Sequence, residues 1–115
     1  MLATVADHIA DLAHAGALDG ADAVGEASAG RRLIVRIGLW LEGDRVARAR
    51  SRATTCASLI AYAEAACRLL ESGEPPGRVD ARALRARVAG VHPVHLVRAD
   101  LVAAALRAAA SRECP

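Results

Sequence analysis

Alternating apolar and polar residues predict two neighbouring β-strands in the first half of the chain. In RRLIVRIGLWL, residues 31–41, every second position from Leu33 to Leu41 is apolar, which is the spacing of one face of a strand. The turn EGD, residues 42–44, follows, and RVARARSRA, residues 45–53, alternates arginine with small residues. The two runs therefore predict an antiparallel hairpin, whose arginine row faces either solvent or a partner.

Apolar residues at three- and four-residue steps predict helices on both sides of this hairpin. Residues 2–14 form a short first helix, and the glycine-rich stretch that follows holds a short third strand near Ala23 to Ala27. After the hairpin, three more helices are expected: one capped by Thr54 or Thr55 that ends at Gly73, one from Asp80 to Gly90, and one after VHPVH that ends near Arg112.

Strands and helices that are segregated along the chain indicate an α+β fold. We expect a small antiparallel sheet of about three strands, with an N-terminal helix and three C-terminal helices packed on one face. No linker divides the sequence, so residues 1–115 are expected to form a single domain.

Composition and charge limit the kinds of partner and the cellular location that we expect for this protein. The net charge of +2 is small, and no basic cluster is interleaved with aromatic residues, so no nucleic-acid partner is expected. The longest apolar run, Leu33 to Leu41, is broken by Arg36, so no membrane span is expected. Polar residues near the N-terminus stand where a signal peptide needs an apolar stretch. We therefore expect a cytoplasmic protein.

Cys56 is the main candidate for chemistry, because it lies where the second strand of the hairpin gives way to a helix. The first turn of a helix favours a thiolate, which could act as a nucleophile or a metal ligand. The alternative is a small residue buried at the bend, and position alone does not decide between them. Cys67 is expected in the core, and Cys114 lies in the tail.

Metal binding is otherwise weakly supported by the residue pattern. No cysteine pair has the C-x-x-C spacing of a structural zinc site. His92 and His95 flank Pro93, and they either share a metal or hydrogen-bond the loop around them.

Three stretches resemble the U-type (NifU/IscU-like) family of iron–sulfur cluster assembly scaffolds. They are DHIADLAHAGALDGADAVGEASAG at residues 7–30, GDRVARARSRATTCASLIAYAEAACRLLESG at residues 43–73, and HPVHLVRADLVAAALRAA at residues 92–109. The resemblance rests on their order and spacing. It implies the α+β fold, a role in iron–sulfur cluster assembly or sulfur transfer without enzymatic activity, and a cysteine desulfurase or other assembly protein as partner.

The resemblance also assigns residues to the family's cluster or zinc site. The first cysteine position falls on Ala29, the aspartate on Arg31, and the histidine–cysteine pair on Val97 and Arg98, whereas the middle cysteine is kept as Cys56. One thiolate cannot hold a two-iron cluster, which takes four thiolate-like ligands. The expected protein is therefore a degenerate scaffold, with an iron–sulfur cluster, iron or zinc held only if His92, His95 or another chain assists Cys56.

Two alternatives to a metal-binding scaffold stay open. The same fold could serve as a metal-free protein-interaction module. Alternatively, Cys56 could carry a persulfide, or border a bound anion, that Arg31 and Arg98 stabilise, if the family fold brings them to it. A homo-oligomer also stays open.

Overall fold

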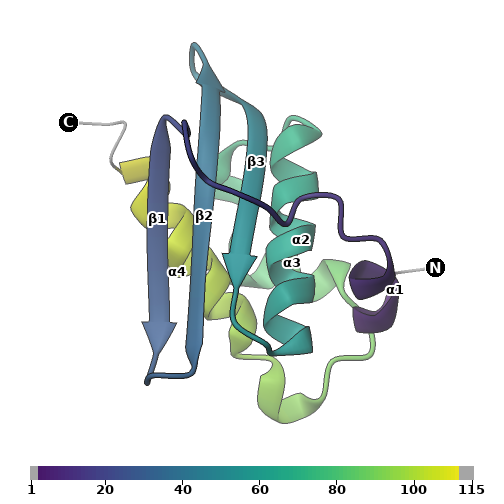
Figure 1. The fold of residues 1–115 in the computed structure, drawn as a ribbon. Helices are drawn as coiled ribbons and strands as arrows, with labels where there is room; N and C mark the ends of the chain where they lie inside the picture. The colour runs from purple at the N-terminus through teal and green to yellow at the C-terminus, as the bar shows by residue number, and fades with distance from the viewer. Residues whose placement is uncertain (1–2, 112–115) are drawn as a thin grey trace.

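The structure is a computed structural model that describes residues 3–111, and it is an α+β fold, as predicted (Figure 1). Its elements are α1 (Val5–Ala10), β1 (Ala23–Ala29), β2 (Leu33–Glu42), β3 (Arg45–Ala53), α2 (Ala57–Glu71), the 3-10 turn η1 (Pro76–Arg78), α3 (Ala81–Arg87), the 3-10 turn η2 (Pro93–His95) and α4 (Arg98–Ser111). The expected end of the last helix at Arg112 lies outside the described residues.

The sheet is antiparallel, in the order β1-β2-β3. Ala29 pairs with Leu33 across the turn between β1 and β2, and Val35 pairs with Ala53 across β2 and β3. Gly43 makes the predicted hairpin turn with a φ of 66°, a conformation that suits glycine. The third strand expected near residues 23–27 continues to residue 29.

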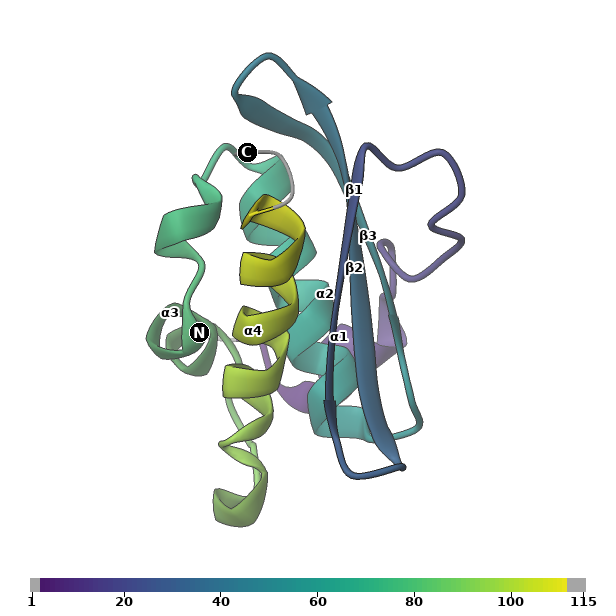
Figure 2. The ribbon, with the colours of Figure 1, turned by 90° about the vertical axis from the view of Figure 1, so that its left-hand side faces the viewer.

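The helices form layers on one side of the sheet (Figure 2). Helices α2 and α4 lie against the strands, α3 packs on α2 and α4, and α1 packs on α2. The opposite, outer face of the sheet is partly covered by the loop that precedes β1 (Figures 1 and 2). That loop lies close because Gly38 has no side chain: an added Cβ there would come within 3.1 Å of Leu18.

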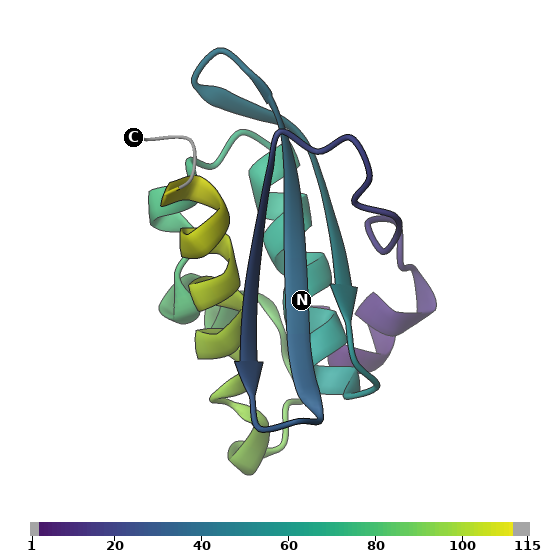
Figure 3. The ribbon, with the colours of Figure 1, turned by 60° about the vertical axis from the view of Figure 1, so that its left-hand side comes forward.

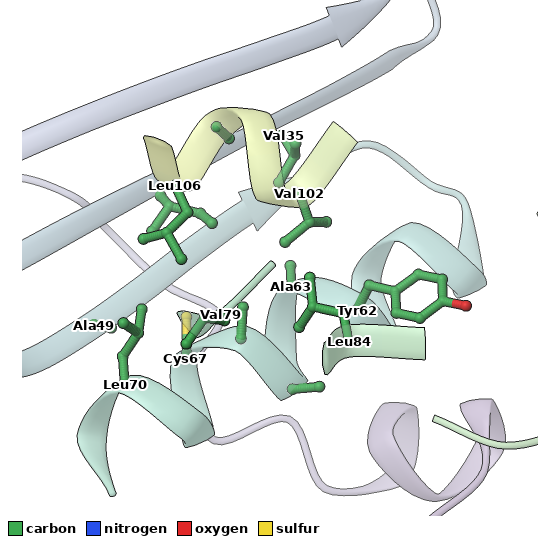
Figure 4. Close-up of a cluster of buried hydrophobic side chains, with 14 of the residues drawn as sticks. Val35, Ala49, Tyr62, Ala63, Cys67, Leu70, Val79, Leu84, Val102 and Leu106 are labelled. Atoms are coloured by element: carbon green, nitrogen blue, oxygen red, sulfur yellow. The ribbon is translucent and has the colours of Figure 1, made fainter. Parts of the chain in front are cut away.

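The core lies between the sheet and the two central helices. Val35, Ile37 and Leu39 alternate along β2 and are almost fully buried, which confirms the predicted inward face. Tyr62 and Cys67 of α2 are buried in the same cluster, which Figure 4 shows together with side chains from α3 and α4. Cys67 is thus a core residue, and burial raises the pKa of its thiol to about 12.

Three predicted helix boundaries were wrong. The helix expected to run to Gly90 is α3, which ends at Arg87. The other two errors come from contacts between distant parts of the chain. The first helix ends at Ala10 and not at residue 14, because the chain then runs beside β3, where the Ser51 N–H donates to the His14 carbonyl at 2.8 Å. The second helix is capped by Cys56. The expected cap Thr54 instead uses its hydroxyl to accept from the Ile34 N–H, which closes the sheet.

No helix in the described part of the chain is long and apolar enough to cross a membrane.

Candidate functional site

Three chain connections gather at one end of the molecule, below the sheet in Figures 1 and 3. They are the β1–β2 turn at residues 30–32, the β3–α2 connection at residues 54–56, and the α3–α4 connection around η2, residues 88–97. We call this the loop end. Every position that the resemblance assigns to the family's ligand site lies on or beside one of these connections.

Three of those positions meet around one hollow between β1 and α4. Ala29, Val97 and Arg98 line it together with Leu33 and other residues, and its volume is about 240 Å³. Its wall is largely apolar, because alanine and valine stand where the family places thiolate and imidazole ligands. These side chains offer no lone pair to a metal, and a guanidinium only donates hydrogen bonds.

Cys56 lies on the neighbouring connection and is not among the described residues that line this hollow. It is the N-cap of α2. The expectation that it lies in the first turn of the helix was wrong. Its side chain is half-buried against the core and makes no capping hydrogen bond, while its N–H donates to the Thr54 carbonyl at 2.7 Å. The thiol therefore lies at the bend and is only partly buried. It is neither in the first turn of the helix nor fully buried in the core.

The two arginines expected beside Cys56 lie in different surroundings. Arg98 begins α4 and is half-buried, and within the described residues its Nε has no hydrogen-bond partner. Arg31 is exposed in the β1–β2 turn and is not part of the described lining of the hollow. The structure therefore brings Arg98 together with Ala29, and within residues 3–111 neither arginine forms a side-chain hydrogen bond with Cys56.

His92 and His95 are held by hydrogen bonds of the loop. Their ring centroids lie 5.7 Å apart. His92 Nδ1 accepts from the Val94 N–H at 3.2 Å, and His95 Nδ1 lies 3.2 Å from the Ser58 hydroxyl. Among residues 3–111, no three His, Cys, Asp or Glu side chains are placed to hold a metal ion. Cys114 lies outside those residues.

Exposed apolar side chains are the most prominent surface feature of the loop end. Val94, Leu96 and Val97 are 65%, 39% and 58% exposed, and with Leu12 they are the exposed large apolar residues of the described chain. Such gathering on a surface marks interaction sites. Sequence reasoning missed this cluster, although VHPVHLV carries no acidic residue or arginine that would have kept it solvated.

A cluster of polar side chains around Glu64, which the sequence did not predict, lies away from the loop end. Glu64 of α2 is only 1% exposed. Its Oε2 lies 2.5 Å from His14 Nδ1 and 2.8 Å from Arg68 Nε, and its Oε1 accepts from the His14 N–H at 2.9 Å. His14 Nε2 lies 2.9 Å from Glu71 Oε1, so both ring nitrogens face a carboxylate.

Hydrogen bonds lower the pKa values of the two glutamates in this polar cluster. Burial would raise the pKa of Glu64, but hydrogen bonds from Arg68 and His14 outweigh it and leave that pKa below its ordinary value. The pKa of Glu71 is also lowered: burial opposes this, and hydrogen bonds from the Ala49 N–H and His14 prevail. The carboxylates of Glu64 and Glu71 and the ring of His14 all have hydrogen-bond partners within the cluster. The cluster therefore fastens the segment after α1 to α2 and β3, and we call it the clamp.

Comparison with known proteins supports the fold and names no function. No family model and no curated protein match the chain. A similar solved structure is the crystal structure of a hypothetical protein at 2.3 Å resolution, which is 20% identical and covers 90% of this chain and 79% of that chain with a TM-score of 0.54. The likeness shows that the two chains share their fold.

Proposed function

We propose that the protein is a degenerate, scaffold-like interaction module of iron–sulfur cluster assembly or sulfur transfer, which binds a protein partner at its loop end and is not an enzyme. One observation carries the proposal: Ala29 lines a single hollow with Val97 and Arg98, from which it is distant in sequence. The resemblance predicts this convergence, because it assigns all three to one ligand site.

The side chains at those positions favour protein binding over metal binding. Alanine, valine and arginine replace groups that would coordinate iron or zinc, and Cys56 is the one cysteine of the resembled site that remains. In place of ligands, the loop end exposes Val94 and Val97. Apolar side chains of this kind form the centre of protein interfaces. A cysteine desulfurase is the partner class that the resemblance suggests.

Binding to a partner tests the proposal. We expect the wild-type protein and Cys56→Ser to bind the cysteine desulfurase of the same genome in isothermal titration calorimetry. The double variant Val94→Ser and Val97→Ser should bind at least roughly tenfold more weakly than wild type. Each substitution removes apolar contact with the partner worth about 1 kcal/mol or more. Leu12→Ser is the matched control, because Leu12 is also exposed, at 39%, but follows α1. Unchanged binding by the double variant would remove the loop end as the interface.

Metal content separates this proposal from a metal-binding scaffold. We expect elemental analysis after anaerobic reconstitution with iron and sulfide to find the same low metal content in wild type and Cys56→Ser, each also carrying Cys114→Ser. About one metal ion per chain that disappears in the Cys56 variant would instead show a site anchored by Cys56. The missing ligands would then be sought at His92, His95 or a second chain.

A further inference from the structure

Two arginines stand at directly paired positions of neighbouring strands on the outer face of the sheet. The register pairs Arg36 of β2 directly with Arg52 of β3, and both residues are exposed. Their neighbours Val35, Ile37 and Ser51 are buried toward the helices, so the arginines lie on the opposite face. Like charges directly opposite each other destabilise a pair of strands.

The charges around this pair leave it with an excess of one cation. Glu26 of β1 forms an ion pair with Arg36, whose Nε lies 2.5 Å from its Oε1. Arg52 forms no ion pair or side-chain hydrogen bond with any residue in the described range 3–111. One carboxylate thus faces two guanidiniums in the row Glu26, Arg36, Arg52.

Two other arginines of the predicted row, Arg48 and Arg50 of β3, are engaged elsewhere, so the row is not uniform. Arg50 turns to Glu71, with Nη1 2.7 Å from its Oε2. The Arg48 guanidinium lies over the Trp40 ring at 4.8 Å from its centroid. Arg52 is therefore the member of the row that is left to bind something outside the described chain.

A hollow of about 440 Å³ lies beside the arginine pair. Arg36 and Arg52 line it together with Ile34, Ala53 and Thr54, and we call it the arginine hollow. The Thr54 hydroxyl is already hydrogen-bonded to Ile34 and Arg36 is paired with Glu26, so the Arg52 guanidinium is the charged group of the hollow that has no partner in residues 3–111. The hollow continues into the β3–α2 connection and thus toward the loop end.

We propose that the arginine hollow binds a carboxylate side chain from an acidic segment of a partner protein. A carboxylate between Arg36 and Arg52 would accept charge-assisted hydrogen bonds from both and neutralise the excess cation. The proposal deepens the proposed function, since it gives the chemistry of the partner that docks at the adjoining loop end. It is nevertheless tested without that partner.

The surroundings favour an acidic polypeptide over a nucleic acid. Single-stranded nucleic acids bind by stacking bases on open aromatic rings. Trp40 has its ring covered by Arg48, and Tyr62 is buried in the core. The whole chain has no Phe and a net charge of only +2, which gives little long-range attraction for a phosphate backbone.

Fluorescence anisotropy with a labelled peptide of alternating glutamate and alanine is the direct test. An extended peptide of this sequence presents its carboxylates on one face. We expect wild type to bind it with a salt-dependent affinity, and Arg52→Gln to bind roughly tenfold more weakly, since a charge-assisted contact of this kind is lost. Arg82→Gln is the matched control, because Arg82 is exposed on α3 and should bind as wild type does.

Thermal unfolding gives a second readout that separates binding from folding. Without peptide, Arg52→Gln should have a melting temperature at or above that of wild type, because a like-charge contact is relieved. Peptide at a concentration that saturates wild type should then raise the melting temperature of wild type by more than that of the variant.

Three results would overturn the proposal. They are no binding of the peptide by wild type, equal binding by Arg52→Gln, or tighter binding of a single-stranded oligonucleotide of equal charge. Unchanged desulfurase binding by the double variant of Val94 and Val97 would contradict the proposed function and leave this test unaffected, so the two failures are distinguishable.

Discussion

A single buried carboxylate, Glu64, joins α2 to the segment that follows α1. Its two oxygens are shared among the His14 backbone, the His14 ring and Arg68, and it is 1% exposed. Burying a carboxylate without enough partners destabilises a protein, because the free energy lost by removing the ion from water exceeds the attraction of a single neighbouring group. The residue therefore stabilises the fold only while its hydrogen-bond partners are complete.

Removing the His14 ring should expose this dependence. We expect His14→Ala to lower the free energy of unfolding by about 3 kcal/mol, because Glu64 then keeps Arg68 as its one side-chain partner. Urea unfolding measures the change. Arg85→Gln is the control: its ion pair with Asp100 is exposed, with side chains 38% and 62% accessible, and it should cost less than about 1 kcal/mol. Equal effects in the two variants would mean that the clamp contributes no special stability.

At the scale of elements, β1 and α4 pack backbone against backbone. A Cβ built at Gly25 would lie 2.0 Å from the Ala105 carbonyl oxygen and 2.3 Å from the Ala109 nitrogen. Both neighbours belong to the backbone of α4, so no side-chain rotation can relieve the clash. This close approach also sets the position of α4, whose first turn supplies Arg98 to the hollow at the loop end.

Gly25→Ala should therefore destabilise the protein strongly. We expect a loss of about 3 kcal/mol, at the upper end of what overpacking of a core costs, since the helix must move away from the strand. Differential scanning calorimetry measures it as a lowered melting temperature. Gly16→Ala is matched, because an added Cβ there meets nothing within 4 Å, and it should stay within about 0.5 kcal/mol of wild type. A wild-type melting temperature for Gly25→Ala would contradict this account of the interface.

Elements were predictable from the sequence where one face of each is buried. Val35, Ile37 and Leu39 give the period-two pattern of β2 because they face the helices, whereas Arg36 between them is exposed on the other face. The end of α1 was not predictable, because it depends on backbone hydrogen bonds to Ser51. The cap of α2 was missed for the same reason, since Ile34 takes the hydroxyl of Thr54.

The site is predictable only where a resemblance can align distant segments. It brought Ala29 together with Val97 and Arg98, and these do line one hollow. No spacing rule relates Arg36 to Arg52, because the register of β2 and β3 creates that pair. The register at the turn, where Glu42 pairs with Arg45, would place Arg36 opposite Ser51, and the irregularity between Trp40 and Leu41 shifts the pairing by one residue. The alternating pattern of the sequence does not contain that shift.

For the whole molecule, these buried charges predict how it unfolds in acid. His8 is 5% exposed, and its ring nitrogens have no hydrogen-bond partner in the described chain. Its pKa is lowered, first by burial and then by the Arg68 cation, whereas the Glu64 carboxylate and the Arg87 carbonyl oppose this. The pKa values of Glu64 and Glu71 are lowered by their hydrogen bonds despite burial.

A group whose pKa is lower in the folded state stabilises the protein above its unfolded pKa and ceases to do so as the pH falls. Stability should therefore be highest above the ordinary histidine pKa of 6.5 and should decline below it through His8. It should decline again below the ordinary glutamate pKa of 4.5 through Glu64 and Glu71.

The melting temperature measured from about pH 8 to about pH 3 should thus fall in two stages. In His8→Leu, which cannot take up the proton, the first stage should disappear while the second remains. A constant melting temperature through the histidine range in wild type would show that His8 is protonated without cost, and hence that its ring has a partner when charged. Because α1 is held to the body of the protein partly around this ring, the first stage should also be the one in which the α1 amides lose hydrogen-exchange protection.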